Sequence, residues 1–129
     1  MSITGVHTIM FGHDAEQIRS FLREVLELNE VDAGGGWPVF ALPPGEIAAH
    51  PSDTDGHYEL YLMCDDLDET MAKLERKGVE FTAEVRAEAW GLVTAVRVPG
   101  GGEIGLYQPK HPTAIRAWTE DPQGAESAV

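Results

Sequence analysis

Two stretches of the chain carry the hydrophobic spacing of an amphipathic helix, and each begins after an aspartate. After Asp14 and after Asp66, apolar residues recur at intervals of three and four, which places them on one face of a helix. Gln17 and Glu69 lie three residues beyond these aspartates, at the spacing of a capping box. We predict two helices, the second ending at Gly78. The two stripes consist of Ile18, Phe21, Leu22, Val25 and Leu26, and of Leu67, Thr70, Met71 and Leu74.

The segments that precede the two helices are also alike. Residues 6–11 and 58–64 are rich in β-branched, aromatic and aliphatic residues, and we predict both as strands. The helix caps lie 52 residues apart, and the same offset places His7 on Glu59. The chain therefore repeats a strand followed by a helix.

The repeat continues beyond the helices. Trp37-Pro38 corresponds to Trp90-Gly91, and residues 44–47 correspond to 101–104, next to turns rich in Gly and Pro. Each half thus predicts a strand, a helix and three further strands. We expect a first βαβββ module over residues 1–51 and a second over 52–112, together forming one domain. A C-terminal extension, residues 113–129, is expected to be partly disordered.

The acidic composition narrows the range of partners. Nine Lys and Arg stand against twenty-two Asp and Glu, for a formal net charge of −13. Nucleic acids and anionic membrane surfaces require clustered positive charge, so we expect neither as a partner. A single cysteine cannot form an intramolecular disulfide, and neither a secretion signal nor a membrane-spanning stretch stands out. We therefore expect a cytoplasmic protein.

Three short motifs carry a resemblance to a known family. Residues 59–68 run Glu-Leu-Tyr-Leu-Met-Cys-Asp-Asp-Leu-Asp, Trp90-Gly91 precedes a predicted strand, and residues 99–109 form a glycine-rich turn and a last strand. With the βαβββ repeat, these motifs resemble the vicinal oxygen chelate (VOC) superfamily of glyoxalase, bleomycin-resistance and extradiol-dioxygenase proteins. The resemblance covers residues 3–109. It implies an α+β fold in which two modules curl a mixed sheet into a cup, and it implies a homodimer.

Strand alternation predicts which side chains face the inside of this cup. Residues 58–64 place one apolar face against a helix and turn Glu59 and Tyr61 inward with His57 and Met63. The aromatic residues are as consistent with a core as with a cage around an aromatic ligand. His13 and His111 are expected at the surface. The residues expected to face a helix are Tyr58, Leu60, Leu62 and Cys64. On the other predicted strands, the residues expected to face inward are His7, Ile9 and Phe11; Glu46, Ala48 and His50; and Glu103, Gly105 and Tyr107. The aromatic residues of this core or cage are Phe11, Trp37, Tyr61, Trp90 and Tyr107.

The resemblance also implies positions for a metal. Relatives that bind one take ligands from positions that align here with His7, Ala48, Glu59 and Gly105. Only His7 and Glu59 have side chains that bind metals, whereas catalytic zinc sites normally use three protein ligands. A third ligand could come from His50, His57 or Glu103, one step along the same faces. The expected ligands are therefore His7 and Glu59, with His57 and Glu103 as further candidates, for a divalent metal such as Zn, Ni, Mn or Fe.

These residues are consistent with three alternative functions. The first is a metal-dependent enzyme of the glyoxalase or dioxygenase type, in which His7 and Glu59 are catalytic and the metal binds vicinal oxygens of the substrate. The second is a non-catalytic, drug-sequestering protein of the bleomycin-resistance type, which would bind a flat or cationic molecule in an acidic cup. The third is metal-free acid–base catalysis by His7 and Glu59. The residues expected to contact the small molecule are Phe11, His50, Tyr61, Trp90 and Tyr107.

Overall fold

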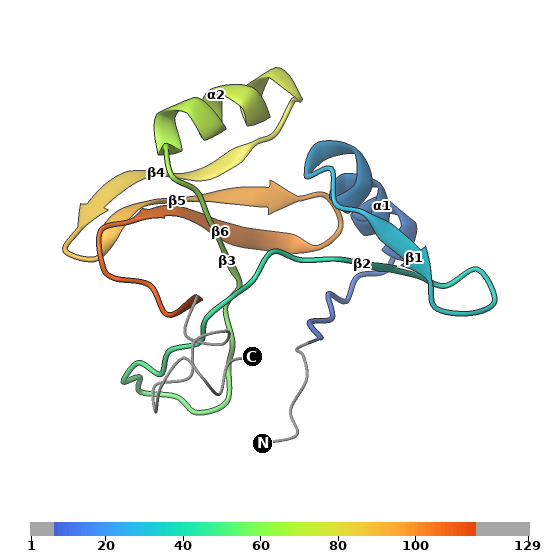
Figure 1. Cartoon of the computed structure of the whole chain (residues 1–129), viewed down its shortest axis with the longest axis horizontal. Coiled ribbons are helices and arrows are strands. Elements are labelled where there is room, and N and C mark those ends of the chain that lie inside the picture. The colour runs from blue at the N-terminus through green and yellow to red at the C-terminus, as the bar shows by residue number, and fades with distance from the viewer. Residues whose placement is uncertain (1–6, 116–129) are drawn as a thin grey trace, which may run out of the picture.

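The protein is described by a computed structural model over residues 7–115 and has a mixed α+β architecture. The chain forms a four-stranded sheet, a two-stranded hairpin and two helices, arranged as in Figure 1. No helix described in this part of the chain is long and apolar enough to cross a bilayer. The elements are α1 (Ala15–Ser20), its π-helical continuation η1 (Phe21–Val25), β1 (Glu30–Asp32), β2 (Pro38–Phe40), β3 (Tyr61–Met63), α2 (Leu67–Arg76), β4 (Phe81–Glu88), β5 (Gly91–Val98) and β6 (Gly102–Pro109).

The sheet takes its strands in the order β3-β6-β5-β4. β6 lies parallel to β3 and antiparallel to β5, which in turn is antiparallel to β4. The strand, helix and three strands predicted for the second half of the chain are therefore confirmed, including the start of β5 directly after Trp90. This half of the chain folds as its alternating pattern indicates.

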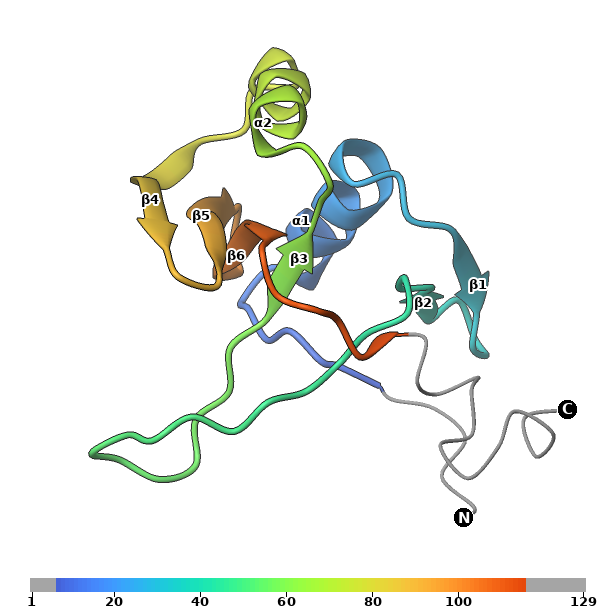
Figure 2. The same ribbon diagram turned by 60° about the vertical axis from the view of Figure 1, so that its left-hand side comes forward.

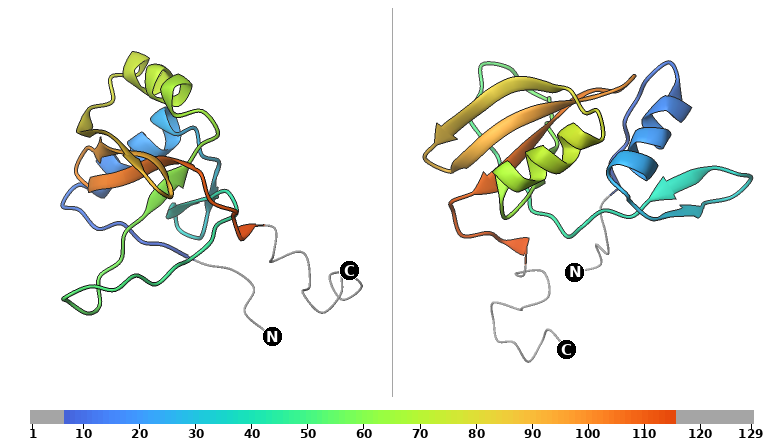
Figure 3. Two further views of the ribbon diagram at one scale, coloured as in Figure 1. Left: turned by 90° about the vertical axis from the view of Figure 1, so that its left-hand side faces the viewer. Right: turned by 90° about the horizontal axis from the view of Figure 1, so that it is seen from above.

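Both helices contribute to one core with the sheet. α2 lies over the sheet and α1 lies beside it, as Figure 2 and the view from above in Figure 3 show. The predicted apolar stripes supply the helix side of the core, and alternate residues of β5 and β6 supply the sheet side. The buried core residues are Ile18, Phe21, Leu67, Leu74, Val96, Val98, Ile104 and Leu106.

The predicted helix caps are also confirmed. The backbone N–H of Gln17 donates to Asp14 at 3.2 Å, and that of Glu69 donates to Asp66 at 3.0 Å. Each carboxylate thus satisfies an N–H group that has no partner inside its helix. Gly78 follows α2 with φ +82°, the left-handed conformation that favours glycine after a helix.

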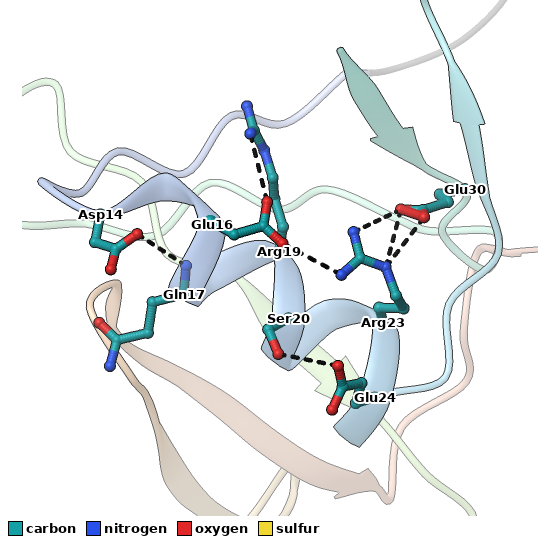
Figure 4. Close-up of polar contacts among 8 residues, drawn as sticks. All are labelled: Asp14, Glu16, Gln17, Arg19, Ser20, Arg23, Glu24 and Glu30. Atoms are coloured by element: carbon teal, nitrogen blue, oxygen red, sulfur yellow. Dashed lines mark hydrogen bonds and ion pairs between the residues drawn. The ribbon is translucent and has the colours of Figure 1, made fainter. Parts of the chain in front are cut away.

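The β1–β2 hairpin stands apart from the four-stranded sheet (Figure 3). Two arginines, Arg19 of α1 and Arg23 of η1, tie it to this helix. Arg23 forms an ion pair with Glu30 at 3.0 Å, and its guanidinium lies 5.8 Å from the centre of the Phe40 ring. Figure 4 shows the same arginine also reaching Glu16. Arg19 stacks over Trp37 at 4.8 Å. Charge and cation–π contacts, rather than a shared core, hold the hairpin in place.

The strands predicted around the hairpin are where the sequence prediction is wrong. Residues 7–13 form no strand, residues 41–60 form none, and the strand predicted over 58–64 shortens to Tyr61–Met63. Ile9 and Tyr58 are 62% and 89% exposed, so the prediction that Tyr58 faces a helix is wrong as well. Residues 7–12 have strand-like composition but pair with none of the described strands. Before Tyr61, the pairing with β6 extends back to Leu60, whose carbonyl accepts a hydrogen bond from the N–H of Gly105 at 2.9 Å. Leu60, Leu62 and Cys64 do pack on the core as predicted.

Candidate functional site

Three aromatic rings meet on the face of the sheet that the helices leave open. Tyr61 comes from β3, Trp90 from the turn before β5, and Tyr107 from β6; we call these three residues the aromatic site. Their centroids lie 6.4 Å (Tyr61–Trp90), 5.8 Å (Tyr61–Tyr107) and 5.4 Å (Trp90–Tyr107) apart, at interplanar angles of 88°, 89° and 75°. Each pair is edge-to-face, a favoured geometry for aromatic rings.

The register of the strands explains this meeting. Tyr61 pairs with Gly105 in parallel β3–β6 register, while Leu62 pairs with Leu106, which faces the core. Because alternate residues point to opposite faces, Tyr61 and Tyr107 share the open face. Tyr107 is only 9% exposed, whereas Tyr61 is 38% exposed. Tyr107 is therefore the floor of the aromatic site and Tyr61 an accessible wall.

A carboxylate lies beside the hydroxyl of Tyr61, and an imidazole lies beside that of Tyr107. The Tyr61 hydroxyl donates to Glu59 at 2.9 Å, and the second oxygen of Glu59 lies 3.6 Å from Nε2 of His57. On the other side, the Tyr107 hydroxyl lies 3.3 Å from Nε2 of His111, and the two rings stack with centroids 6.1 Å apart. The aromatic site is thus bordered by the carboxylate of Glu59 next to Tyr61 and by the imidazole of His111 next to Tyr107.

Glu46 joins this second border from the other half of the chain. One of its oxygens accepts a hydrogen bond from the backbone N–H of Ala114 at 2.6 Å, and the other lies 3.9 Å from Nε2 of His111. The Glu46 side chain is 18% exposed. These contacts fasten the segment after β6 to the long connection between β2 and β3.

Burial and the two carboxylates change the acidity of the tyrosines. Burial raises the pKa of Tyr61, and the hydrogen bond to Glu59 and its charge raise that pKa further. Burial also raises the pKa of Tyr107, with a smaller contribution from the charge of Glu46. Both hydroxyls therefore remain protonated at neutral pH and serve as hydrogen-bond donors.

An open depression of about 480 Å³ adjoins the aromatic site at His111. Cys64 lies in its wall and donates a weak hydrogen bond to the carbonyl of Tyr107, with Sγ and O 3.6 Å apart. Burial raises the pKa of this thiol, which disfavours the reactive thiolate. The depression is lined by Met63, Cys64, Asp65, Gln108, Pro109, His111 and Thr113.

The structure brings together some of the residues proposed to contact a small molecule and separates others. Tyr61, Trp90 and Tyr107 form one cluster. Phe11 is 85% exposed and His50 is also exposed, on segments that form no strand. Two neighbours of the cluster are Glu46 and His111, and the expectation that His111 lies at the surface is wrong, because its ring is half-buried and stacks on Tyr107. The inward-facing pattern that includes Glu46 is the one signal that points to either of them.

The candidate metal ligands do not assemble into a site. His57 and Glu59 are neighbours, but their side chains are 58% and 60% exposed. His7 and Glu103 are exposed as well. Over residues 7–115, no three side chains of His, Cys, Asp or Glu lie close enough together to hold a metal ion. This donor set therefore does not fit the three-ligand grip that a catalytic divalent metal needs.

Comparison with known proteins places these features in a family. The model of the Glyoxalase/Bleomycin resistance protein/Dioxygenase superfamily matches residues 5–124. TnmS3, an antibiotic binding protein from Streptomyces sp. CB03234, is 26% identical; the match covers 85% of this chain and 99% of TnmS3, with a TM-score of 0.61. No curated protein matches the sequence.

Two more distant solved structures share the fold. A member of the same superfamily from Sphaerobacter thermophilus DSM 20745 is 24% identical, with 84% of this chain and 99% of that chain covered and a TM-score of 0.55. A lactoylglutathione lyase from Agrobacterium tumefaciens is 15% identical, with 84% and 96% covered and a TM-score of 0.55.

Proposed function

The chain belongs to the glyoxalase/bleomycin resistance protein/dioxygenase superfamily, and we propose that within it the protein is a non-catalytic binder of flat, cationic aromatic molecules. The observation that carries this proposal is the aromatic site, with its three edge-to-face rings on an open sheet face. Aromatic side chains offer a large contact area to a planar ligand at little cost in conformational entropy.

The electrostatic surroundings favour a cation. Glu59 borders Tyr61 directly, and Glu46 borders the Tyr107–His111 pair. The chain has a formal net charge of −13, which raises the local concentration of cationic ligands. A positive group placed over an aromatic face gains a further attraction from the ring quadrupole. The aromatic rings and the neighbouring carboxylates therefore both favour a positively charged ligand.

The similarity to an antibiotic binding protein agrees with this role. The metal-dependent enzyme expected from the resemblance would use His7 and Glu59 as catalytic ligands for Zn, Ni, Mn or Fe. Since no third donor joins these two side chains within residues 7–115, we derive no step through a metal. Metal-free catalysis by the same pair would need the His7 imidazole next to Glu59, and the hydrogen-bond and ion-pair partners of Glu59 within residues 7–115 are Tyr61 and His57.

We also propose that the protein is a homodimer. Support comes from the apolar side chains left open on segments without a strand partner: Phe11 is 85% and Ile47 is 90% exposed. Large exposed apolar surface of this kind is typical of a protein interface. Sedimentation of the intact protein as a monomer over a range of concentrations would contradict this part of the proposal alone.

The binding function is tested with proflavine, a planar aromatic cation. We expect wild-type protein to bind it equally well with and without EDTA. Trp90→Ala removes two edge-to-face contacts and is expected to weaken binding about tenfold. Trp37→Ala is the matched control, because Trp37 is 64% exposed on the hairpin and lies under Arg19. Binding that requires added metal, or that Trp37→Ala weakens as much as Trp90→Ala, contradicts the proposal.

A further inference from the structure

Gly105 has an unusual reason to be a glycine. Its φ is not in the left-handed range, in contrast to Gly100 and Gly102 in the preceding turn. The backbone of β6 would therefore accept an L-amino acid at this position. What excludes a side chain is space: a Cβ on Gly105 would overlap Cγ, Cδ2 and Cε2 of the Tyr61 ring.

The ring that fills this space is the accessible wall of the aromatic site. Tyr61 lies on the strand next to Gly105, in direct register with it, and its ring covers the bare backbone of β6. In that position the ring meets Trp90 and Tyr107 edge-to-face, and its hydroxyl reaches Glu59. Any side chain at position 105 would push the Tyr61 ring away from all three partners.

We propose that Gly105 is the positioning residue that sets the shape of the aromatic site, by letting the Tyr61 ring lie flat across β6 and so selecting planar aromatic ligands. The proposal rests on the proposed binding function for its ligand class, and on geometry alone for the placement of Tyr61. A glycine paired with an aromatic residue across two strands also stabilises a sheet. The test must therefore separate ring placement from stability.

A double-mutant cycle separates ring placement from stability, because an effect that Gly105→Ala exerts through the Tyr61 ring disappears when that ring is removed. The variants are Gly105→Ala, Tyr61→Ala and the pair together. Gly45→Ala is the matched control, since a Cβ added at Gly45 would meet no atom within 4 Å and the φ of Gly45 is not left-handed. The readouts are near-ultraviolet circular dichroism of the ligand-free protein, and the affinities for proflavine and for cyclohexylamine, a cation that is not flat.

Gly105→Ala is expected to reduce the aromatic circular dichroism as much as Tyr61→Ala does, and to weaken proflavine binding about tenfold while weakening cyclohexylamine binding clearly less. In the Tyr61→Ala background the same substitution should change neither quantity. If Gly105→Ala does not fold, the double variant should fold, because the overlap is gone.

Three results overturn the inference. They are an unchanged dichroism in Gly105→Ala, an equal loss of affinity for both cations, and a full additional effect of Gly105→Ala in the Tyr61→Ala background. Failure of the wild-type protein to bind proflavine contradicts the binding function and the ligand selection that depends on it. The dichroism cycle then still decides whether Gly105 places the Tyr61 ring.

Discussion

Replacing Glu59 by Gln should reduce the preference of the protein for a charged ligand over an uncharged one of the same shape. Gln keeps an oxygen that can accept the Tyr61 hydroxyl bond, now 2.9 Å long, so the ring should stay in place while the charge is lost. Because the Glu59 side chain is 60% exposed, solvent screens its charge, and the exposed-pair range of about 0.2–1 kcal/mol applies. The preference should therefore fall about 1.4- to 5-fold.

The assay compares proflavine with acridine, which has the same three fused rings and is uncharged above neutral pH. The ratio of their affinities is measured by calorimetry at low and at high salt for wild type and Glu59→Gln. Since about 1 M salt shortens the screening length to about 3 Å, the difference between the two proteins should shrink there. Glu75→Gln, an exposed position on α2 across the sheet, changes the net charge equally and is the control.

If Glu75→Gln lowers the affinity ratio as much as Glu59→Gln does, the preference comes from the net charge of the chain and not from Glu59. An equal loss of affinity for acridine and proflavine in Glu59→Gln would also contradict the role of the Glu59 charge. That result would mean that the substitution moved the Tyr61 ring instead of removing a nearby charge.

Two further predictions concern stability. The folded-state pKa of Tyr61 lies above its ordinary value of about 10. The stability that the protonated Tyr61 hydroxyl contributes is therefore fully present below about pH 10 and is lost as the pH rises through the folded pKa. Tyr61→Phe should accordingly flatten the alkaline fall in the free energy of unfolding measured in urea between about pH 8 and 11, and an unchanged slope would contradict the assignment. Leu67→Ala, at a side chain only 1% exposed, should lower that free energy by about 2–5 kcal/mol. Asp68→Ala, one residue further and exposed, should change it by less than about 1 kcal/mol, and equal losses would refute the assignment of Leu67 to the core.

The sequence pattern is most informative where burial repeats along an element. The stripe of α2, capped by Asp66 and ended by Gly78, is predictable because every third or fourth residue faces the core. The alternation that buries Val96 and Val98 likewise predicts β5. Such patterns depend on neighbours a few residues away, so a single sequence reveals them.

The candidate site is predictable only in part, for a physical reason. Tyr61 and Tyr107 lie on strands whose facing follows from alternation, so their meeting is foreseeable. The hydrogen bond from Ala114 to Glu46 joins two irregular segments 68 residues apart. No periodicity constrains such a contact, and the association of Glu46 with His111 emerges only from the fold.

The position of β3 links the aromatic site to the first half of the chain, where the predicted strands beside the sheet do not form. β3 is an edge strand of the sheet, and edge strands expose backbone groups that readily pair with another strand. Tyr61 stands on this edge, so any strand that pairs with β3 would also border the aromatic site. Residues 7–12 have the β-branched and aromatic side chains that suit such pairing, and they form no strand themselves. The proposed homodimer and the proposed ligand site would therefore share a boundary at β3, and ligand affinity should depend on assembly.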